Sequence, residues 1–274
     1  MMKYIKLIYL NFKKIISDIE SLLYTDSFRH NLIIDSGKAS INLNFPEDIK
    51  RVRIDIGLSH NAPNSAKWIK DNQDLMVIGI EANQHNIRKI LRCGIWSKND
   101  KNRIIKPYKT KRLQLIYGAI DNVPQPGFSD FYNIRGDSGT SSLLKPTNAL
   151  LKGYGYTVRS ITKTPTFPLK ILLQQFPWER FPYIEVCKID TQGKDLDVLL
   201  SMGEYIKKIA MILVEVDTFG QYEGAPTRAQ IYDFMQRNGF GEHEVISNIN
   251  NAVVDVIFFN ENYMSLKNEI DKNI

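Results

Sequence analysis

Short apolar runs alternate with amphipathic windows along most of the chain. From Arg51 onward the runs predict strands, and windows with apolar positions spaced by three and four predict helices. The predicted elements are strand 51–56, helix 62–70, strand 75–81, helix 84–92, strand 113–120, helix 168–176, strand 183–189, helix 194–206, strand 210–216 and helix 227–238. Nearly continuous apolar strands separated by helices indicate a mostly parallel sheet with helices on both faces.

The last two apolar runs differ from this alternation. Residues 243–249 and 252–259 are joined by a short polar segment around Asn-Ile-Asn-Asn, which predicts a hairpin rather than another strand-helix crossover. Dinucleotide dehydrogenases continue with a parallel crossover at this point. The sequence therefore predicts an α/β fold with a Rossmann-like open sheet, mostly parallel, that closes with an antiparallel C-terminal hairpin strand.

The pattern also suggests how the chain is divided. Residues 1–50 are expected to form an N-terminal extension: an amphipathic helix over 3–24, capping the main domain or facing a membrane surface or partner, and then an irregular or weakly stranded segment. The main domain spans 51–260. A segment rich in Gly, Ser, Thr and Pro at 122–165 is expected to cover the substrate, and 261–274 is a polar tail.

Composition narrows the classes of partner. The 36 basic and 30 acidic side chains give a net charge of +6, but the excess is spread and no aromatic-basic module accompanies it, so no nucleic acid is expected. Cys93 and Cys187 fit neither a disulfide framework nor a metal site and are expected to be reduced core thiols. The apolar run Ile5–Phe12 is too short to span a membrane, so a cytoplasmic protein is expected, with its oligomeric state left open.

The run Asp55-Ile-Gly-Leu-Ser-His-Asn61 follows the first strand of the alternating pattern. A side chain at Gly57 would keep a ligand from the amides of the turn, and the next helix would direct its N-terminal dipole at an anionic group. We therefore interpret Asp55, Gly57, Ser59 and Asn61 as cofactor-binding residues. Asparagine tolerates a left-handed backbone, so Asn61 can stand where a second glycine is common. A plain strand-to-helix turn is the alternative.

Acids also mark the ends of the next two strands. Glu81 stands 26 positions after Asp55, the offset of a ribose-binding acid in nucleoside-binding sheets. A surface acid on a loop is the alternative. Asp121 follows the third strand and could accept a hydrogen bond from an adenine amino group while Ile120 packs against the ring.

A further motif runs from Val186 to Leu200. Its strand delivers Lys188 and Asp190 at the carboxyl end, and Gly193 allows a tight turn into the following helix. Ligands bind at the carboxyl ends of strands in open sheets, so Asp190 is expected to face the cofactor crevice. The alternative is that Asp190 only caps the helix.

Together the motifs resemble a known family. The segments Asp55-Ile-Gly, Ile80-Glu-Ala-Asn83, Gly118-Ala-Ile-Asp121, Thr140-Ser-Ser-Leu143, Lys188-Ile-Asp-Thr-Gln-Gly193 and Ile212-Leu-Val-Glu-Val216 occur in this order. In that order they resemble the FkbM-type family of S-adenosylmethionine-dependent methyltransferases over roughly residues 50 to 260. The closing hairpin agrees, because it is the pattern of class I methyltransferases. Gln192 departs from the family's Lys-Ile-Asp-x-Glu-Gly motif, which usually has glutamate there.

The resemblance implies S-adenosylmethionine as the cofactor, with Asn83 among its binding residues. It also implies O-methylation, frequently of sugar hydroxyls in glycans, polysaccharides or glycosylated natural products, so the expected acceptor is a saccharide or glycoside. Methyl transfer requires an acceptor oxygen held in line with the methyl group and a group that helps to remove its proton. Asp190, beside the expected sulfonium, and Lys188 are the predicted catalytic residues.

The substrate-binding residues that we predict from the insertion and from the later strand ends are Arg135, Asp137, Ser141, Gln192 and Glu215. No metal is expected. Mg²⁺ held by Asp190, Glu215 and Asp217 is the less favoured alternative, since carboxylates at one crevice edge suit that ion.

Two other functions share parts of this pattern. A nicotinamide-dependent oxidoreductase uses the same strand, loop and acid, but it requires a fuller glycine loop than Asp55 to Asn61 provides. A catalytically silent binding module on the same fold would have an acceptor crevice that is filled or closed.

Overall fold

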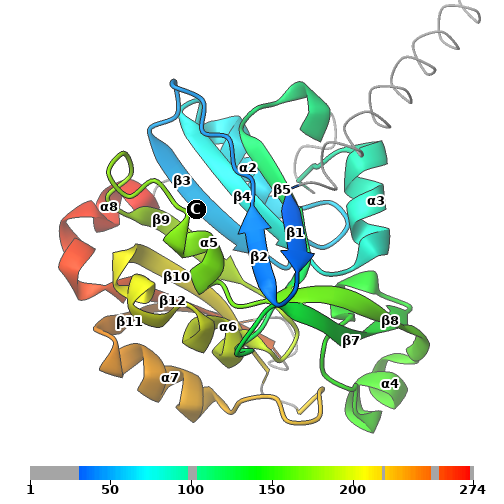
Figure 1. The fold of residues 1–274 in the computed structure, drawn as a ribbon. Helices are drawn as coiled ribbons and strands as arrows, with labels where there is room; N and C mark the ends of the chain where they lie inside the picture. Colours follow the sequence, from blue (N-terminus) through cyan, green and yellow to red (C-terminus); the bar gives the residue numbers. More distant parts are fainter. Residues whose placement is uncertain (1–30, 98–103, 218–219, 248–252, 272–274) are drawn as a thin grey trace, which may run out of the picture.

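The computed structural model describes residues 31–97, 104–217, 220–247 and 253–271 (Figure 1). Its centre is a seven-stranded sheet in the order β11-β12-β10-β9-β3-β4-β5. The five parallel strands are β3 (Arg51–Ile56), β4 (Leu75–Glu81), β5 (Leu113–Tyr117), β9 (Ile184–Ile189) and β10 (Ile209–Asp217). The helix predicted over residues 3–24 lies outside the described residues.

The closing hairpin has the predicted form. β11 (Phe240–Ser247) and β12 (Val253–Asn260) are antiparallel, and β12 also pairs antiparallel with β10, so that it lies between β10 and β11. Sequence and structure therefore agree on a mostly parallel Rossmann-like sheet with an antiparallel final strand, which is the class I methyltransferase arrangement.

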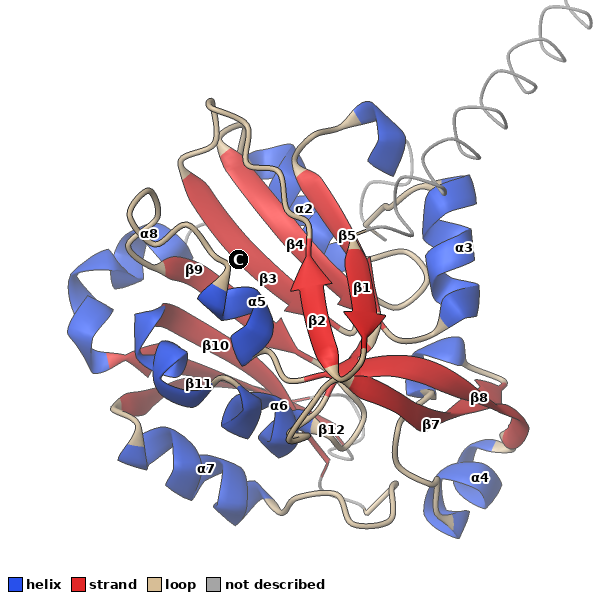
Figure 2. Ribbon diagram, in the orientation of Figure 1, coloured by secondary structure: helices blue, strands red, loops and turns tan. Residues whose placement is uncertain are grey.

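Helices cover both faces of the sheet, as Figure 2 shows. On one face α2 (Pro63–Asp71) and α3 (Gln84–Cys93) pack against a buried cluster that includes Trp68, Ile90 and Val77. The other face is covered by α5 (Lys170–Gln174), α6 (Asp195–Ser201) and α7 (Arg228–Arg237) over a second cluster. Burying each large aliphatic side chain of these clusters contributes about 1.5–3 kcal/mol, so the two-sided core holds the strand ends in fixed positions.

Three predicted elements are interrupted, and glycine or proline accounts for each. The strand predicted over 113–120 breaks at Gly118, after which β6 (Ala119–Ile120) pairs with a different sheet. Pro168 and Pro177 confine the predicted 168–176 helix to the five residues of α5. The helix predicted over 194–206 ends before Gly203, which has a left-handed φ of 59°, and continues as a 3₁₀ helix, Gly203–Lys208.

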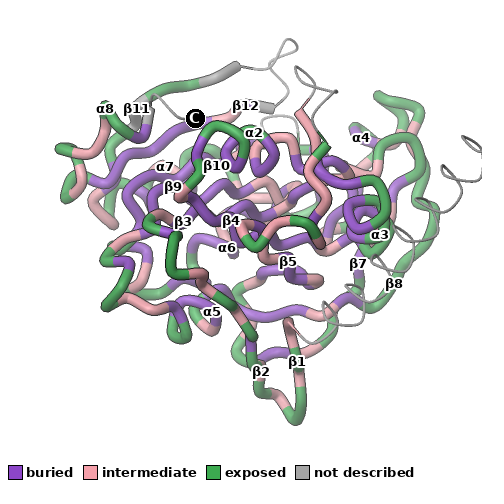
Figure 3. Tube along the Cα trace, turned by 90° about the horizontal axis from the view of Figure 1, so that it is seen from above, coloured by how far each residue is buried: buried purple, intermediate pink, exposed green. Residues whose placement is uncertain are grey.

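The insertion predicted to cover the site is itself stranded. β7 (Gly127–Arg135) and β8 (Thr157–Phe167) form a long antiparallel ribbon, and the chain between them contains the 3₁₀ turn η2 (Ser138–Thr140) and α4 (Asn148–Tyr154). Most of β8 is exposed, whereas buried residues concentrate in the central strands (Figure 3). The ribbon therefore extends from the core and carries η2 back across the strand ends.

The two ends of the described chain are more ordered than their composition indicates. β1 (Leu32–Asp35) and β2 (Lys38–Ile41) form a hairpin in the segment expected to be irregular or weakly stranded. The predicted polar tail contains a 3₁₀ helix, Glu261–Leu266, and α8 (Lys267–Asp271), whose Ile270 is buried in the core. Tyr263 and Leu266 pack against the same cluster as Ile270, and the polarity of the local sequence does not reveal contacts with residues this distant.

Two other expectations concern the surface. Cys187 is buried in β9, but Cys93 at the end of α3 is exposed, so the prediction that both are core thiols is wrong for Cys93. No helix within the described ranges combines the length and the apolar character needed to cross a membrane.

Candidate active site

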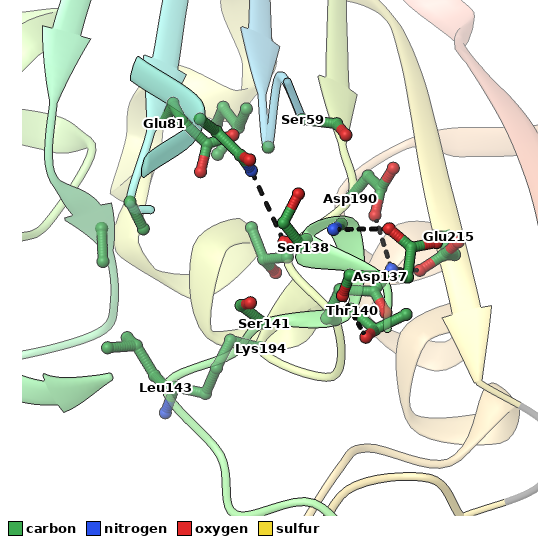
Figure 4. A pocket seen from close by; sticks show the side chains of 18 of the residues that line it. Ser59, Glu81, Asp137, Ser138, Thr140, Ser141, Leu143, Asp190, Lys194 and Glu215 are labelled. Atoms are coloured by element: carbon green, nitrogen blue, oxygen red, sulfur yellow. Dashed lines mark hydrogen bonds between the residues drawn. The ribbon is translucent and has the colours of Figure 1, made fainter. Parts of the chain in front are cut away.

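A cavity of about 460 Å³ opens at the carboxyl ends of β3, β4, β9 and β10 (Figure 4). This volume lies in the range of small-molecule and cofactor sites. Residues of β6, η2 and α4 complete its lining. In Figure 4, Glu81 lies on one side of the cavity and Asp190 and Glu215 lie on the other. Parallel strands end at the same edge of the sheet, so polar residues far apart in sequence meet here.

Gly57 lies where the ends of β3 and β9 approach most closely. Its φ is +81°, and a Cβ added to it would lie 1.8 Å from the backbone oxygen of Asp190. The Gly57 amide donates to Ile80, and the Asp190 amide donates to Ile56, so the three strands remain joined beyond their last ladder bonds. The glycine is thus required by backbone packing, and not only by the access of a ligand as the sequence suggested.

The turn after Gly57 is strained at residues other than the one expected. Ser59 and Ala62 have left-handed φ values of 58° and 43°, whereas Asn61 does not lie in that region. The expectation that Asn61 takes the left-handed place is therefore wrong. Its side-chain amide instead donates to the carbonyl of Trp96 at 3.2 Å, which ties the turn to the chain after α3.

Glu81 is the acid of this cavity with the most complete set of backbone donors. Its side chain is 5% exposed and accepts from the Asn83 amide at 2.6 Å, from the Ser59 amide and from the Asn86 side chain. Burial raises the pKa of Glu81 to about 7 despite these donors. The carboxyl group is thus held rigidly at the end of β4, and its ionisation falls near neutral pH.

Asn86 offers an acceptor beside this acid. It is 1% exposed and lines the cavity, and its Oδ1 has no hydrogen-bond partner among the described residues. A buried acceptor without a partner is costly, so a ligand hydroxyl or a water at this place would be stabilised.

Asn83 supports the site from outside its lining. Its Oδ1 caps α3 by accepting from the His85 amide, and its Nδ2 donates to Ser141 Oγ at 3.2 Å and to the Ser138 carbonyl at 3.4 Å. The Asn83 side chain thus links the start of α3, through Oδ1, to η2 and the residue after it, through Nδ2. Asn83 therefore fixes the segment that crosses the cavity.

Ile120, the last residue of β6, and Asp121, which follows it, lie differently relative to the cavity. Ile120 is 2% exposed and lies in the lining. The Asp121 carboxylate instead forms an ion pair of 2.8 Å with Lys194, which also pairs with Asp197. Asp121 is therefore outside the lining, although its partner Lys194 is part of it.

β9 supplies the central charge pair. Lys188 Nζ lies 3.0 Å from Asp190 Oδ2 and 3.8 Å from Asp55 Oδ1. Burial alone would raise the pKa of Asp190, but the Lys188 ammonium and the Gln192 amide outweigh it and hold this pKa below its usual range. Asp190 lines the cavity with 29% of its side chain exposed, while Lys188 lies behind it, outside the lining.

Asp55 lies below the cavity floor. It is 1% exposed, accepts a hydrogen bond of 2.6 Å from Ser65 Oγ and is not part of the lining. Burial raises its pKa, although the Lys188 charge acts in the opposite direction. A contact between Asp55 and a ligand would therefore have to pass through Lys188 or through the turn at Gly57.

Glu215 of β10 faces Asp190 across a single amide. Gln192 Nε2 donates to Asp190 Oδ1 at 2.8 Å and to Glu215 Oε2. Burial, followed by the charge of Asp190, raises the pKa of Glu215 well above its usual range. The two acids thus differ in their proton affinity: Asp190 is ionised at neutral pH, and Glu215 retains its proton to higher pH.

A match to a family model decides the assignment. Residues 53–241, more than half of the chain, match the methyltransferase FkbM domain. The chain belongs to the FkbM methyltransferase family. It is an S-adenosylmethionine-dependent methyltransferase, which sets aside the nicotinamide-dependent alternative. No curated protein matches the chain.

Several solved structures share parts of the fold with this FkbM methyltransferase. The S-adenosylmethionine-bound magnesium protoporphyrin IX methyltransferase of Synechocystis PCC 6803 is 7% identical with a TM-score of 0.40, over 78% of this chain and 72% of that one. Fibrillarin of Aeropyrum pernix, also bound to S-adenosylmethionine, is 7% identical with a TM-score of 0.41, over 79% and 70%. Identities and TM-scores this low do not bear on substrates or on residue roles.

The cavity of the FkbM methyltransferase brings together ten of the residues predicted from the sequence. They are Gly57, Ser59, Asn61, Glu81, Ile120, Asp137, Ser141, Asp190, Gln192 and Glu215. Five predicted residues lie outside the lining, namely Asp55, Asn83, Asp121, Arg135 and Lys188. Ion pairs or hydrogen bonds hold the side chains of four of these, and Arg135 is exposed at the end of β7.

Sequence reasoning missed Asp195 at the start of α6. Its carboxylate is 2% exposed and accepts from the amides of Thr191 and Gly193 and from the Thr191 hydroxyl. Burial raises the pKa of Asp195 to about 7. It fixes the turn that carries Gln192, and its place in the first helical turn after a Thr-x-Gly is the signal that could have revealed it.

The structure describes the side chains of only two residues of the metal alternative, Asp190 and Glu215. Among the residues that the structure describes, no group of three or more histidine, cysteine, aspartate or glutamate side chains is arranged to hold a metal ion. The Asp217 side chain is outside the described part of the chain.

We expect Gly57→Ala to destabilise the FkbM methyltransferase by roughly 2–5 kcal/mol, because the new Cβ has no room and the backbone there is left-handed. Urea unfolding followed by circular dichroism measures this. Gly153→Ala is the matched control, since nothing lies within 4 Å of an added Cβ in that helical position. Equal stability of the two variants would show that β3 and β9 can separate at no cost.

Proposed function

We propose that this methyltransferase transfers the methyl group of S-adenosylmethionine to a hydroxyl group of a sugar or glycan. The observation that carries the proposal is an ionised carboxylate, Asp190, exposed to the cavity at the strand end beside the Gly57 turn. A hydroxyl has a proton to donate, and a carboxylate acceptor orients it.

The residues present fit an adenosine cofactor. The Glu81 carboxyl at the end of β4 and the partnerless Oδ1 of Asn86 in the first turn of α3 are neighbouring acceptors, suited to the two ribose hydroxyls. Ile120 and Phe131 would border the adenine ring. When bound, S-adenosylmethionine supplies a methyl group on a positively charged sulfur.

In the proposed mechanism, the acceptor hydroxyl donates a hydrogen bond to Asp190. This hydrogen bond orients the hydroxyl so that a lone pair of the hydroxyl oxygen would point at the methyl carbon. As the acceptor oxygen bonds to the methyl carbon, the carbon–sulfur bond would break and its electron pair would stay with sulfur. The oxygen gains the positive charge, so its proton becomes acidic and moves to Asp190. A carboxylate with a low pKa is a weak base, which suits a proton transfer that follows attack. Lys188 keeps Asp190 ionised until then.

The acceptor side of the cavity has features suited to a saccharide. Tyr154 and Tyr156 stack with ring centroids 5.6 Å apart, and both line the cavity beside Asp137. Tyr154 is 47% exposed, so its free ring face is open to solvent. Aromatic faces and a carboxylate that accepts hydrogen bonds are what a sugar ring requires.

Labelled S-adenosylmethionine incubated with a panel of monosaccharides, glycosides and polysaccharides tests the proposal. We expect label to be transferred to at least one hydroxyl compound and to be stable to mild base, as an ether is. Transfer only to amines, carboxylates or nucleic acid, with every saccharide unlabelled, would contradict O-methylation of a sugar.

Cofactor affinity should depend on pH through Glu81. Ribose hydroxyls donate to the ionised carboxylate, so protonation with a pKa of about 7 weakens binding as the pH falls. We expect S-adenosylhomocysteine to bind roughly tenfold more weakly at pH 6 than at pH 8.5 in calorimetric titrations. A Glu81→Gln variant should lose this dependence, and an unchanged pH profile in the variant would assign the titration to another group.

Tyr154→Ala should weaken acceptor binding but not cofactor binding. Loss of one stacking surface corresponds to about 0.5–1.5 kcal/mol, or roughly a two- to twelvefold rise in the KM for the acceptor. Tyr108→Ala, a change in a tyrosine outside the cavity lining, is the control. If the Tyr154 variant has a normal KM and a lowered kcat, the Tyr154 ring does not bind the acceptor and this part of the proposal is wrong.

A further inference from the structure

The Gln192 side-chain amide donates a hydrogen bond to both Asp190 and Glu215. A side-chain amide nitrogen carries two protons, so this arrangement uses both. Gln192 also adopts a left-handed backbone with φ of 57°, a conformation that costs a non-glycine residue energy unless its surroundings impose it. The Ser142 hydroxyl, which donates to the Gln192 carbonyl at 2.7 Å, is one such constraint.

The orientation of this amide decides what the carboxyl groups encounter. A half-turn of the amide plane would direct Oε1 at two acid groups and leave them without the donors. Asp190 would keep the Lys188 ammonium as a donor, whereas Glu215 faces further acids, Asp195 and Asp255, whose charges raise its pKa. With the NH₂ group directed at the acids, Oε1 needs a donor partner on the far side of the amide.

Tyr222 is that partner. Its hydroxyl lies 2.8 Å from Gln192 Oε1 and 2.7 Å from the Thr140 carbonyl, so one proton is shared between two acceptors. The residue is 4% exposed, and its backbone pairs with Pro146 in an antiparallel bridge. A hydroxyl fixed in this way gives Oε1 a donor while the NH₂ group faces the two acids.

We propose that Tyr222 is a positioning residue of the methyltransferase: its hydroxyl holds the Gln192 amide with the NH₂ group directed at Asp190 and Glu215. Through the Thr140 carbonyl the same hydroxyl links this amide to η2, the segment that crosses the cavity. The consequence for turnover rests on the proposed role of Asp190, whereas the orientation of the amide does not.

Side-chain amide resonances of ¹⁵N-labelled full-length protein test the orientation without any acceptor. The Gln192 pair is assigned by its disappearance in Gln192→Met. We expect Tyr222→Phe to move this pair toward the position of an unbonded glutamine amide. Tyr232→Phe, which removes a hydroxyl bonded to Arg228 on α7, should leave it in place. An unmoved Gln192 pair in Tyr222→Phe overturns the proposal.

The role in turnover is tested by a double-mutant cycle with an acceptor found in the saccharide screen. We expect Tyr222→Phe and Gln192→Met to lower kcat by similar factors with unchanged cofactor Kd, and the double variant to be no slower than Gln192→Met. The positioning role is overturned if the two factors on kcat multiply in the double variant. It is also overturned if Tyr222→Phe shifts the Gln192 resonance and leaves kcat normal. If no saccharide is methylated, the proposed function fails while the resonance experiment still decides the orientation.

Discussion

Alanine in place of Glu81 should abolish measurable binding of S-adenosylhomocysteine. The carboxyl accepts from two backbone amides and the Asn86 side chain, which hold it at the end of β4. Charge-assisted hydrogen bonds contribute roughly 1.5–3 kcal/mol each, so loss of two to the ribose weakens the Kd by about 10²–10⁴. Isothermal titration calorimetry measures the affinity.

A second variant, Glu81→Gln, tests whether a loss of binding comes from unfolding. The folded-state pKa of Glu81, about 7, lies above its ordinary value of 4.5, so the buried carboxyl group binds its proton more tightly in the folded than in the unfolded chain. Its contribution therefore favours folding at low pH and is lost as the pH rises from about 4.5 to about 7. We expect Glu81→Gln to unfold at the same or higher urea concentration than the wild type at pH 8. A variant that binds cofactor normally would remove Glu81 from the site.

Asp190→Asn should stop methyl transfer while leaving the cofactor bound. The amide cannot accept the proton and orients a hydroxyl poorly, and loss of such a group typically lowers kcat by about 10²–10⁴. Initial rates with labelled S-adenosylmethionine measure this, together with the Kd for S-adenosylhomocysteine, which we expect to change by less than about threefold, a difference under 1 kcal/mol.

Asp121→Asn is the matched substitution, because that carboxylate is also paired with a lysine, Lys194, but is not part of the cavity lining. It should leave kcat near the wild-type value. Both variants remove a lysine partner, so a comparable loss in both would indicate that the effect comes from a disrupted ion pair and not from the chemistry at Asp190.

The fold was predictable because its main signals are local. Each central strand is a short apolar run. A polar segment between two such runs indicates the hairpin of β11 and β12. The strand break at Gly118 was not predictable, because it depends on a crowded contact. A Cβ added to Gly118 would lie 3.0 Å from the Phe167 ring. Nothing in residues near Gly118 encodes a partner almost fifty positions away.

The site was predictable to the extent that strand ends determine it. Glu81, Asp190 and Glu215 follow from topology alone, since the ends of parallel strands share one edge. Tyr222 and Asn86 did not follow, because each lies one or more residues beyond a strand or inside a helix and contributes through a single atom. Asp55 and Lys188 were assigned to the ligand because sequence position cannot distinguish a group in the lining from one just below it.

A crystal structure of the complex with S-adenosylhomocysteine tests most directly whether these strand ends form the methyl-transfer site. We expect the ribose hydroxyls on Glu81 and Asn86, and the sulfur beside the Asp190 carboxylate with open space for an acceptor between them and the tyrosine pair. A cofactor bound elsewhere, or one whose sulfur lies away from Asp190, would contradict the proposed site.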